Sequence, residues 1–124
     1  MSKKMFLFYL NKKEINQKDY HIVIYIGEHV NHKDELFKIF SSQLHFPSYF
    51  GENWDAFYDC LCSLDYPNTT KILILHEDLP FKESETDRVA YIDILSDVES
   101  NLKYKDYRID VAFQIKYRNL ISNE

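Results

Sequence analysis

The sequence predicts an α/β fold in which helices pack on a mainly parallel, three-stranded core sheet, with an extra strand near the N-terminus. Residues 20–26, 71–75 and 109–115 are short runs rich in β-branched and other apolar residues, as expected for the core strands. The first two runs are apolar almost throughout, which is typical of strands covered on both faces. Amphipathic segments separate the runs, and this alternation favours parallel pairing.

Two elements precede the middle of the chain. Residues 5–10 are apolar and aromatic and predict the extra strand. After the run at 20–26, Asn31-His32-Lys33-Asp34 has the spacing of a capping box with Asp in place of Glu. A helix is expected to follow, because one helical face is apolar at Leu36, Phe37, Phe40 and Leu44.

Three further elements complete the expected fold. A short helix is expected to begin after Asn53 and to lead into the strand at 71–75. Ser84-x-x-Asp87 offers a cap for a longer helix, whose apolar face carries Tyr91, Ile92, Leu95, Val98 and Leu102. The run at 109–115 alternates only in part, and this indicates a strand at an edge of the sheet.

Length and composition indicate a globular protein. A chain of 124 residues suffices for one core, so residues 1–124 are expected to form a single domain. Hydrophobic residues make up 45% and aromatic residues 16% of the chain, which can supply that core. Only two Gly and three Pro are present, and this argues against a disordered chain.

Charge and cysteine content narrow the class of partner. Twenty acidic against fifteen basic residues give a net charge of −5, which disfavours direct nucleic-acid binding and suits a basic protein partner. Cys60 and Cys62 lie two residues apart on a predicted helix and point in different directions, so they cannot bridge each other. We therefore expect a reduced, cytoplasmic protein. The run at 5–10 is too short for a signal peptide, and no segment is long enough for a membrane helix.

The stretch 45–61 is where function is expected. Asn53 can cap the helix that follows, and Asp55 then lies in the first turn, where the helix dipole favours an anion. One helical face is apolar, and the other carries Asp55, Tyr58, Asp59 and Cys62. The two aspartates repel each other at a cost of roughly 0.2–0.5 kcal/mol. With Tyr49 and Tyr58 beside them, they suit either a surface for a cationic partner or an ordinary solvated acidic face.

Enzymatic alternatives have weaker support. Glu52, Asp55 and Asp59 could hold a hard divalent ion in a magnesium-dependent hydrolase, because carboxylates suit such ions. The same stretch, however, contains no general base and no Lys or Arg for a phosphate. His29-x-x-His32, or Cys60-x-Cys62 with His76, lacks convincing zinc spacing. No metal or other cofactor is predicted.

A longer motif resembles a known family. Phe46-Pro47-x-Tyr49-Phe50-Gly51-Glu52-Asn53-x-Asp55-Ala56-x-x-Asp59-Cys60-Leu61 is similar to the signature of the barstar family, the intracellular inhibitors of barnase-type ribonucleases. The resemblance implies a barstar-like fold and a partner that is a basic, extracellular-type ribonuclease. It also implies that residues 1–19 extend the family core. An immunity protein against a different nuclease toxin and a structural or regulatory adaptor are alternatives.

The resemblance also implies roles for individual residues. Asp59 would take the place of the substrate phosphate, with Tyr49 stacking at the mouth of the nuclease cleft. Tyr58 stands where the family often has Trp, and Leu64 stands where barstar has a large aromatic residue. Asp97 aligns loosely with a family glutamate. The partner-binding residues expected on this basis are Tyr49, Gly51, Asn53, Asp55, Tyr58, Asp59, Asp65 and Asp97.

Overall fold

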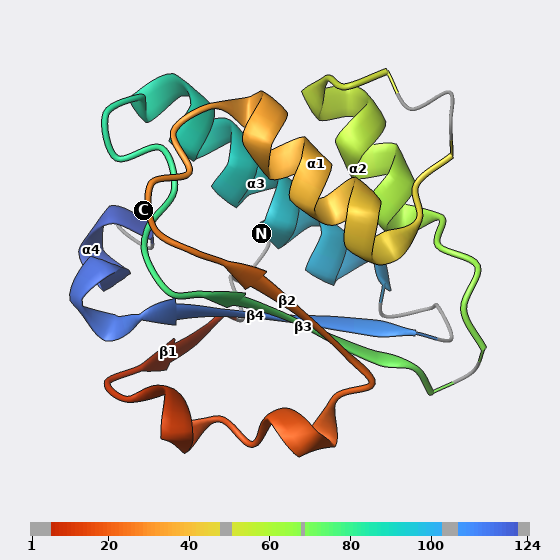
Figure 1. Cartoon of the computed structure of the whole chain (residues 1–124), viewed down its shortest axis with the longest axis horizontal. Helices are drawn as coiled ribbons and strands as arrows, with labels where there is room; N and C mark the ends of the chain where they lie inside the picture. Colours follow the sequence, from red (N-terminus) through yellow and green to blue (C-terminus); the bar gives the residue numbers. More distant parts are fainter. Residues whose placement is uncertain (1–5, 48–50, 68, 103–106, 122–124) are drawn as a thin grey trace.

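The fold is built on a four-stranded parallel sheet. The computed structural model describes residues 6–47, 51–67, 69–102 and 107–121. The strands lie in the order β1-β4-β3-β2, and each neighbouring pair is parallel. One face of the sheet is covered by the helices α1 (Lys33–Leu44), α2 (Trp54–Cys62) and α3 (Glu85–Asn101) (Figure 1). The predicted α/β fold with a parallel core sheet is confirmed.

Strands β3 (Lys71–His76) and β4 (Arg108–Gln114) form the centre of the sheet, and β2 (Ile22–Ile26) lies at one edge. The prediction that the strand at 109–115 lies at an edge is wrong. The side of β4 that faces away from β3 pairs with β1 (Leu7–Tyr9). Asp110 interrupts the apolar pattern of β4. Its partly buried carboxylate nevertheless has a hydrogen-bond partner, because it accepts from the Tyr20 hydroxyl at 2.6 Å.

The three helices begin at caps that lie close to those expected. The N-cap of α1 is His32, one residue later than expected, because Glu35 accepts from the His32 backbone N–H at 3.1 Å. Ser84 caps α3 as predicted, accepting from the backbone N–H of Asp87 at 3.3 Å. Buried aromatic side chains from all three helices meet above the sheet, among them Phe37, Phe40, Phe57 and Tyr91.

The N-terminal segment covers the opposite face of the sheet. The strand expected at residues 5–10 is observed as β1, with Met5 outside the described residues. After β1, the short 3-10 helices η1 (Lys12–Glu14) and η2 (Gln17–Asp19) pass beneath the strands (Figure 1). A second, smaller apolar cluster forms there, comprising Tyr9, Leu73, Leu75 and Ala112 with Ile15, Tyr20 and Val23 packed against it. This cover explains why β3 is apolar on both faces.

A buried polar network joins the centre of the sheet to α3. His76, at the end of β3, has no exposed surface and stacks on the Phe113 ring with 4.0 Å between centroids. Its Nδ1 lies 2.9 Å from the carbonyl oxygen of Ala112, and its Nε2 lies 2.7 Å from the Tyr91 hydroxyl. Burial lowers the pKa of His76 to about 3, so the ring is neutral. Nδ1–H therefore donates to the carbonyl, and Nε2 accepts from the tyrosine.

Two short elements follow β4, namely η4 (Ile115–Tyr117) and α4 (Arg118–Ile121). Within the described ranges, no helix has both the length and the apolar character needed to cross a membrane.

Candidate functional site

Helix α2 is fixed at its N-terminus by Asn53 and on its inner side by the core. The side-chain oxygen of Asn53 accepts from the backbone N–H of Ala56 at 2.9 Å, and its amide donates to the carbonyl oxygen of Gly51 at 3.4 Å. Phe57 and Leu61 are completely buried beneath the helix. Trp54 packs edge-on against the Phe37 ring with 5.0 Å between centroids. The helix is therefore held in one rotation about its axis.

That rotation places the carboxylates of Asp55 and Asp59 in solvent, one turn apart. Within the described part of the chain, neither carboxylate has a Lys, Arg or His side chain within ion-pair distance. The Ser63 hydroxyl donates to the backbone oxygen of Asp59 at 2.6 Å and so closes the end of the helix. Asp55 and Asp59 thus form a pair of uncompensated negative charges on a rigid support.

Tyr58 borders this pair on the side facing α3. The side-chain amide of Asn101, at the end of α3, donates to the Tyr58 hydroxyl. Burial raises the pKa of that hydroxyl, and the neighbouring Cys62, Asp97 and Asp59 raise it further, so the hydroxyl keeps its proton. An aromatic ring with a neutral polar tip therefore lies beside Asp59, held from a second helix.

The loop after α2 is held from below by Tyr107. The Tyr107 hydroxyl donates to the backbone oxygen of Leu61 at 2.8 Å and accepts from the backbone N–H of Leu64 at 3.0 Å. Tyr107 itself is buried just before β4. Asp65 follows directly and is exposed. The second end of α2 is therefore as firmly placed as the first.

The structure brings most of the expected site residues to one region. Asp55, Tyr58 and Asp59 share a face of α2, Asn53 and Gly51 lie at its start, and Asp65 lies after its end. Asp97 reaches the same region from α3, near Tyr58. Tyr49 lies outside the described residues. No observation of the structure tests whether these residues bind a partner, so their role stays a prediction.

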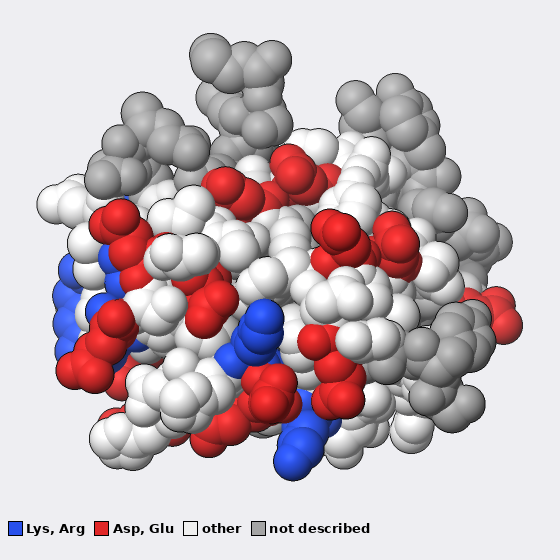
Figure 2. All heavy atoms as spheres, turned by 90° about the horizontal axis from the view of Figure 1, so that it is seen from above, with Lys and Arg blue, Asp and Glu red and all other residues white. Residues whose placement is uncertain are grey.

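The helix-covered side of the molecule is predominantly acidic. Figure 2 shows this side with many Asp and Glu side chains and few Lys and Arg. Exposed carboxylates on α1, α2, α3 and their connections include Asp34, Glu35, Glu52, Asp55, Asp59, Asp65, Glu85, Asp93 and Asp97. The field above this face attracts cations and positively charged proteins.

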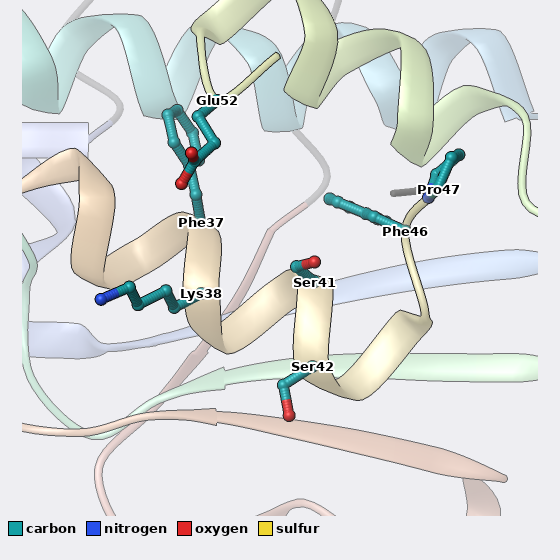
Figure 3. Close-up of a pocket in the computed structure, with 7 residues that line it drawn as sticks. All are labelled: Phe37, Lys38, Ser41, Ser42, Phe46, Pro47 and Glu52. Carbon is teal, nitrogen blue, oxygen red and sulfur yellow. The ribbon is translucent and has the colours of Figure 1, made fainter. Parts of the chain in front are cut away.

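Two hollows have Phe46 and Pro47 in their lining. The first, about 480 Å³ in volume, lies beside α1 and is lined by Lys38, Ser41 and Glu52 among others. In Figure 3, Glu52 reaches over the Phe37 ring toward α1, and Lys38 extends along the outside of the same helix. One cation, one anion and hydroxyls line this hollow together, so it favours no single class of ion. The second hollow, about 330 Å³, lies between the C-terminal ends of α1 and α2.

The carboxylates do not form a metal site. Glu52, Asp55 and Asp59, which the magnesium-hydrolase alternative requires together, are all described. Across the described ranges, no group of three or more His, Cys, Asp or Glu side chains is arranged to hold an ion. Glu52 instead lines the first hollow, and the two aspartates of α2 face solvent.

Asn101 and Tyr107 are the site residues that sequence reasoning missed. Asn101 lies 43 residues from Tyr58, and Tyr107 lies 46 residues from Leu61, the groups that they contact. No local pattern marks contacts of this range. For Tyr107 a signal exists, because the backbone groups at the end of α2 need hydrogen-bond partners. The contact of Asn101 with the Tyr58 hydroxyl has no such signal.

The comparisons with known proteins point to one family. Residues 20–116, most of the chain, match the model of the family described as Barstar (barnase inhibitor). The comparison with curated proteins gave no match.

Proposed function

The chain belongs to the barstar family, and we propose that it inhibits a basic ribonuclease by inserting the acidic face of α2 into the nuclease active site. Family membership implies a barnase inhibitor or a related immunity protein. The observation that carries the finer proposal is the pair of exposed carboxylates, Asp55 and Asp59, on a helix whose two ends are fixed by hydrogen bonds.

The physical reasoning concerns the cations of the nuclease. An enzyme that cleaves RNA must bind phosphate with Arg, Lys or His side chains, and a preorganised carboxylate meets the same groups. Asp59 is proposed to occupy the phosphate position and Asp55 to pair with a neighbouring cation. Tyr58 contributes aromatic contact area beside them. Electrostatic potentials of opposite sign on the inhibitor and the nuclease increase the rate of association.

The protein is proposed to bind without chemistry of its own, in the cytoplasm of a cell that makes the nuclease or meets it from a neighbour. A different nuclease toxin is the second candidate target. The acidic face supports it equally, because any nuclease needs cations at its phosphate site. The residues 1–19, which precede the family match, are proposed to be an addition to the family core within one domain.

The test is a titration into a fixed amount of barnase while RNA cleavage is followed. Wild-type protein is expected to inhibit stoichiometrically. Asp59→Ala is expected to weaken inhibition by about 2–5 kcal/mol, or roughly 30- to 4,000-fold, the general range for an interfacial charge pair that has lost one partner. Barstar–barnase measurements contributed to that range. Asp34→Ala, an exposed carboxylate at the far end of α1, is the matched control and is expected to change inhibition little.

The same assay separates the alternatives. RNA cleavage by this protein alone, dependent on Mg²⁺, would favour a hydrolase. Retention of the nuclease by Asp59→Ala with unchanged affinity would favour an adaptor that uses another surface. Failure of the wild-type protein to inhibit barnase would direct the search to nuclease toxins of other classes.

A further inference from the structure

The second hollow, beside α2, is a pocket with a defined apolar lining. The α1–α2 pocket, as we call it, lies between the C-terminal ends of these helices and has a volume of about 330 Å³. Its apolar wall includes Leu44, Phe46, Leu64 and Tyr66, and Asp65 is also one of the lining residues. Leu44 and Phe46 are buried in the core, so this wall continues the hydrophobic interior to the surface.

The walls of the pocket are fixed by specific contacts. His45 ends α1 in a left-handed conformation with φ of 54°, and the backbone N–H of Phe46 donates to the Ser41 carbonyl at 3.3 Å. On the other side, the Tyr107 hydroxyl binds the backbone of Leu64, and the Tyr66 and Tyr107 rings meet edge to face with 6.4 Å between centroids. Binding of a ligand in this pocket therefore has a small entropic cost, because the side chains of the wall are already ordered.

The charge of the pocket is negative. The titratable side chains that line it are Asp65, His45, Cys60 and Tyr66. Burial raises the pKa of the Cys60 thiol and of the Tyr66 hydroxyl, so both are neutral at pH 7. Among the described lining residues, Asp65 is thus the only source of negative charge. A pocket that combines an apolar wall with one carboxylate matches a long side chain with a cationic end.

The pocket adjoins the proposed inhibitory face. Ser63 lines the pocket, and its hydroxyl donates to the backbone oxygen of Asp59. Cys60, the residue after Asp59, lines it as well. The pocket and the surface that carries Asp59 therefore adjoin each other.

We propose that the α1–α2 pocket receives one arginine or lysine side chain of the partner nuclease, outside that enzyme's phosphate site. Its methylene groups lie along Phe46, Leu64 and Tyr66, and its cationic group binds Asp65. This inference rests on the proposed function and adds a second anchor point to it. Leu64 is part of this wall, so its side chain contributes to the choice of nuclease.

The test uses the full chain with barnase as the probe and measures the dissociation constant for three variants. Asp65→Asn removes the charge and is expected to weaken binding about tenfold. Leu64→Ala removes part of the apolar wall along which the methylene groups lie and is expected to weaken binding several-fold. Asp34→Asn, which removes the same charge far from the pocket, is expected to stay within about twofold. Circular dichroism and the thermal midpoint identify any variant that misfolds.

A double-mutant cycle then identifies the nuclease residue. Surface Arg and Lys residues of barnase are replaced by Ala one at a time, and each is combined with Asp65→Asn. One such replacement is expected to weaken binding to wild-type protein about tenfold and to have little further effect on binding to Asp65→Asn. That non-additivity would identify the side chain that enters the pocket.

Two results would overturn the inference, and they differ in what else they overturn. If Asp59→Ala weakens binding but Asp65→Asn and Leu64→Ala both remain within about twofold of wild type, the pocket is empty in the complex and the proposed function stands. If wild-type protein does not bind barnase, the proposed function fails for this nuclease and the pocket assignment fails with it.

Discussion

His76 makes the stability of the fold depend on pH already between about pH 6.5 and 5, above the range in which most carboxylates titrate. Its pKa falls from the ordinary value of 6.5 to about 3 on folding, because the ring is fully buried between Ala112, Tyr91 and Phe113. Protonation therefore favours the unfolded chain. The associated stability is fully present above about pH 7 and is lost as the pH falls from 6.5 towards 3.

The size of the effect follows from the two pKa values. At pH 5 the linkage relation gives a loss of about 2 kcal/mol relative to pH 8, and the complete shift corresponds to about 5 kcal/mol. A loss of 2 kcal/mol is a large part of the stability of a small domain, which is about 5–15 kcal/mol. The unfolding free energy should be measured by urea denaturation at several pH values between about 8 and 5.

The control is His76→Gln, whose amide can donate to the Ala112 carbonyl and whose oxygen can accept from Tyr91. This variant has no group that titrates at the position. The difference in unfolding free energy between wild type and variant should shrink by about 2 kcal/mol between pH 8 and pH 5. A difference that stays constant over this interval would refute the reasoning, because other groups contribute equally to both proteins.

Three further predictions concern the hydrogen bonds that hold α2 and the N-terminal segment that covers the sheet. Asn53→Ala removes the N-cap of α2 and should lower the unfolding free energy by about 1 kcal/mol in urea denaturation, whereas Asn53→Asp should retain most of it. Tyr107→Phe leaves the backbone N–H of Leu64 without its acceptor and should cost about 1–3 kcal/mol while weakening inhibition; unchanged values of both would show that Tyr107 does not hold the loop. Deletion of residues 1–19 removes Tyr9 and Ile15 from the second apolar cluster, exposes its members on β3 and β4 and should increase binding of a hydrophobic dye; a variant with wild-type dye binding and stability would contradict the covering role.

Local chemistry made the start of α2 predictable from sequence. Asn53 caps the helix through an atom three residues from its partner, and the apolar stripe decides which face is buried. From those two facts it follows that Asp55 and Asp59 face solvent, as the structure shows. Such predictions succeed because the interacting groups are close in sequence.

Long-range pairing could not be predicted in the same way. Asp110 made β4 resemble an edge strand, yet Tyr20 satisfies its carboxylate from 90 residues away and β1 pairs with the strand. The contact of Asn101 with Tyr58 and the clamp by Tyr107 depend equally on how α3 and β4 lie against α2. Periodicity reports which face of an element is buried, but it does not report which element covers it.

The central claim is that the acidic face of α2 occupies the phosphate site of a basic ribonuclease. The most direct measurement is a competition experiment, in which the dissociation constant for barnase is determined calorimetrically with increasing amounts of a 3′-mononucleotide that fills the enzyme's phosphate site. The account predicts that the apparent dissociation constant rises in proportion to the nucleotide concentration, because Asp59 and the phosphate exclude each other. An unchanged dissociation constant, with nucleotide and protein bound to the enzyme together, would contradict it.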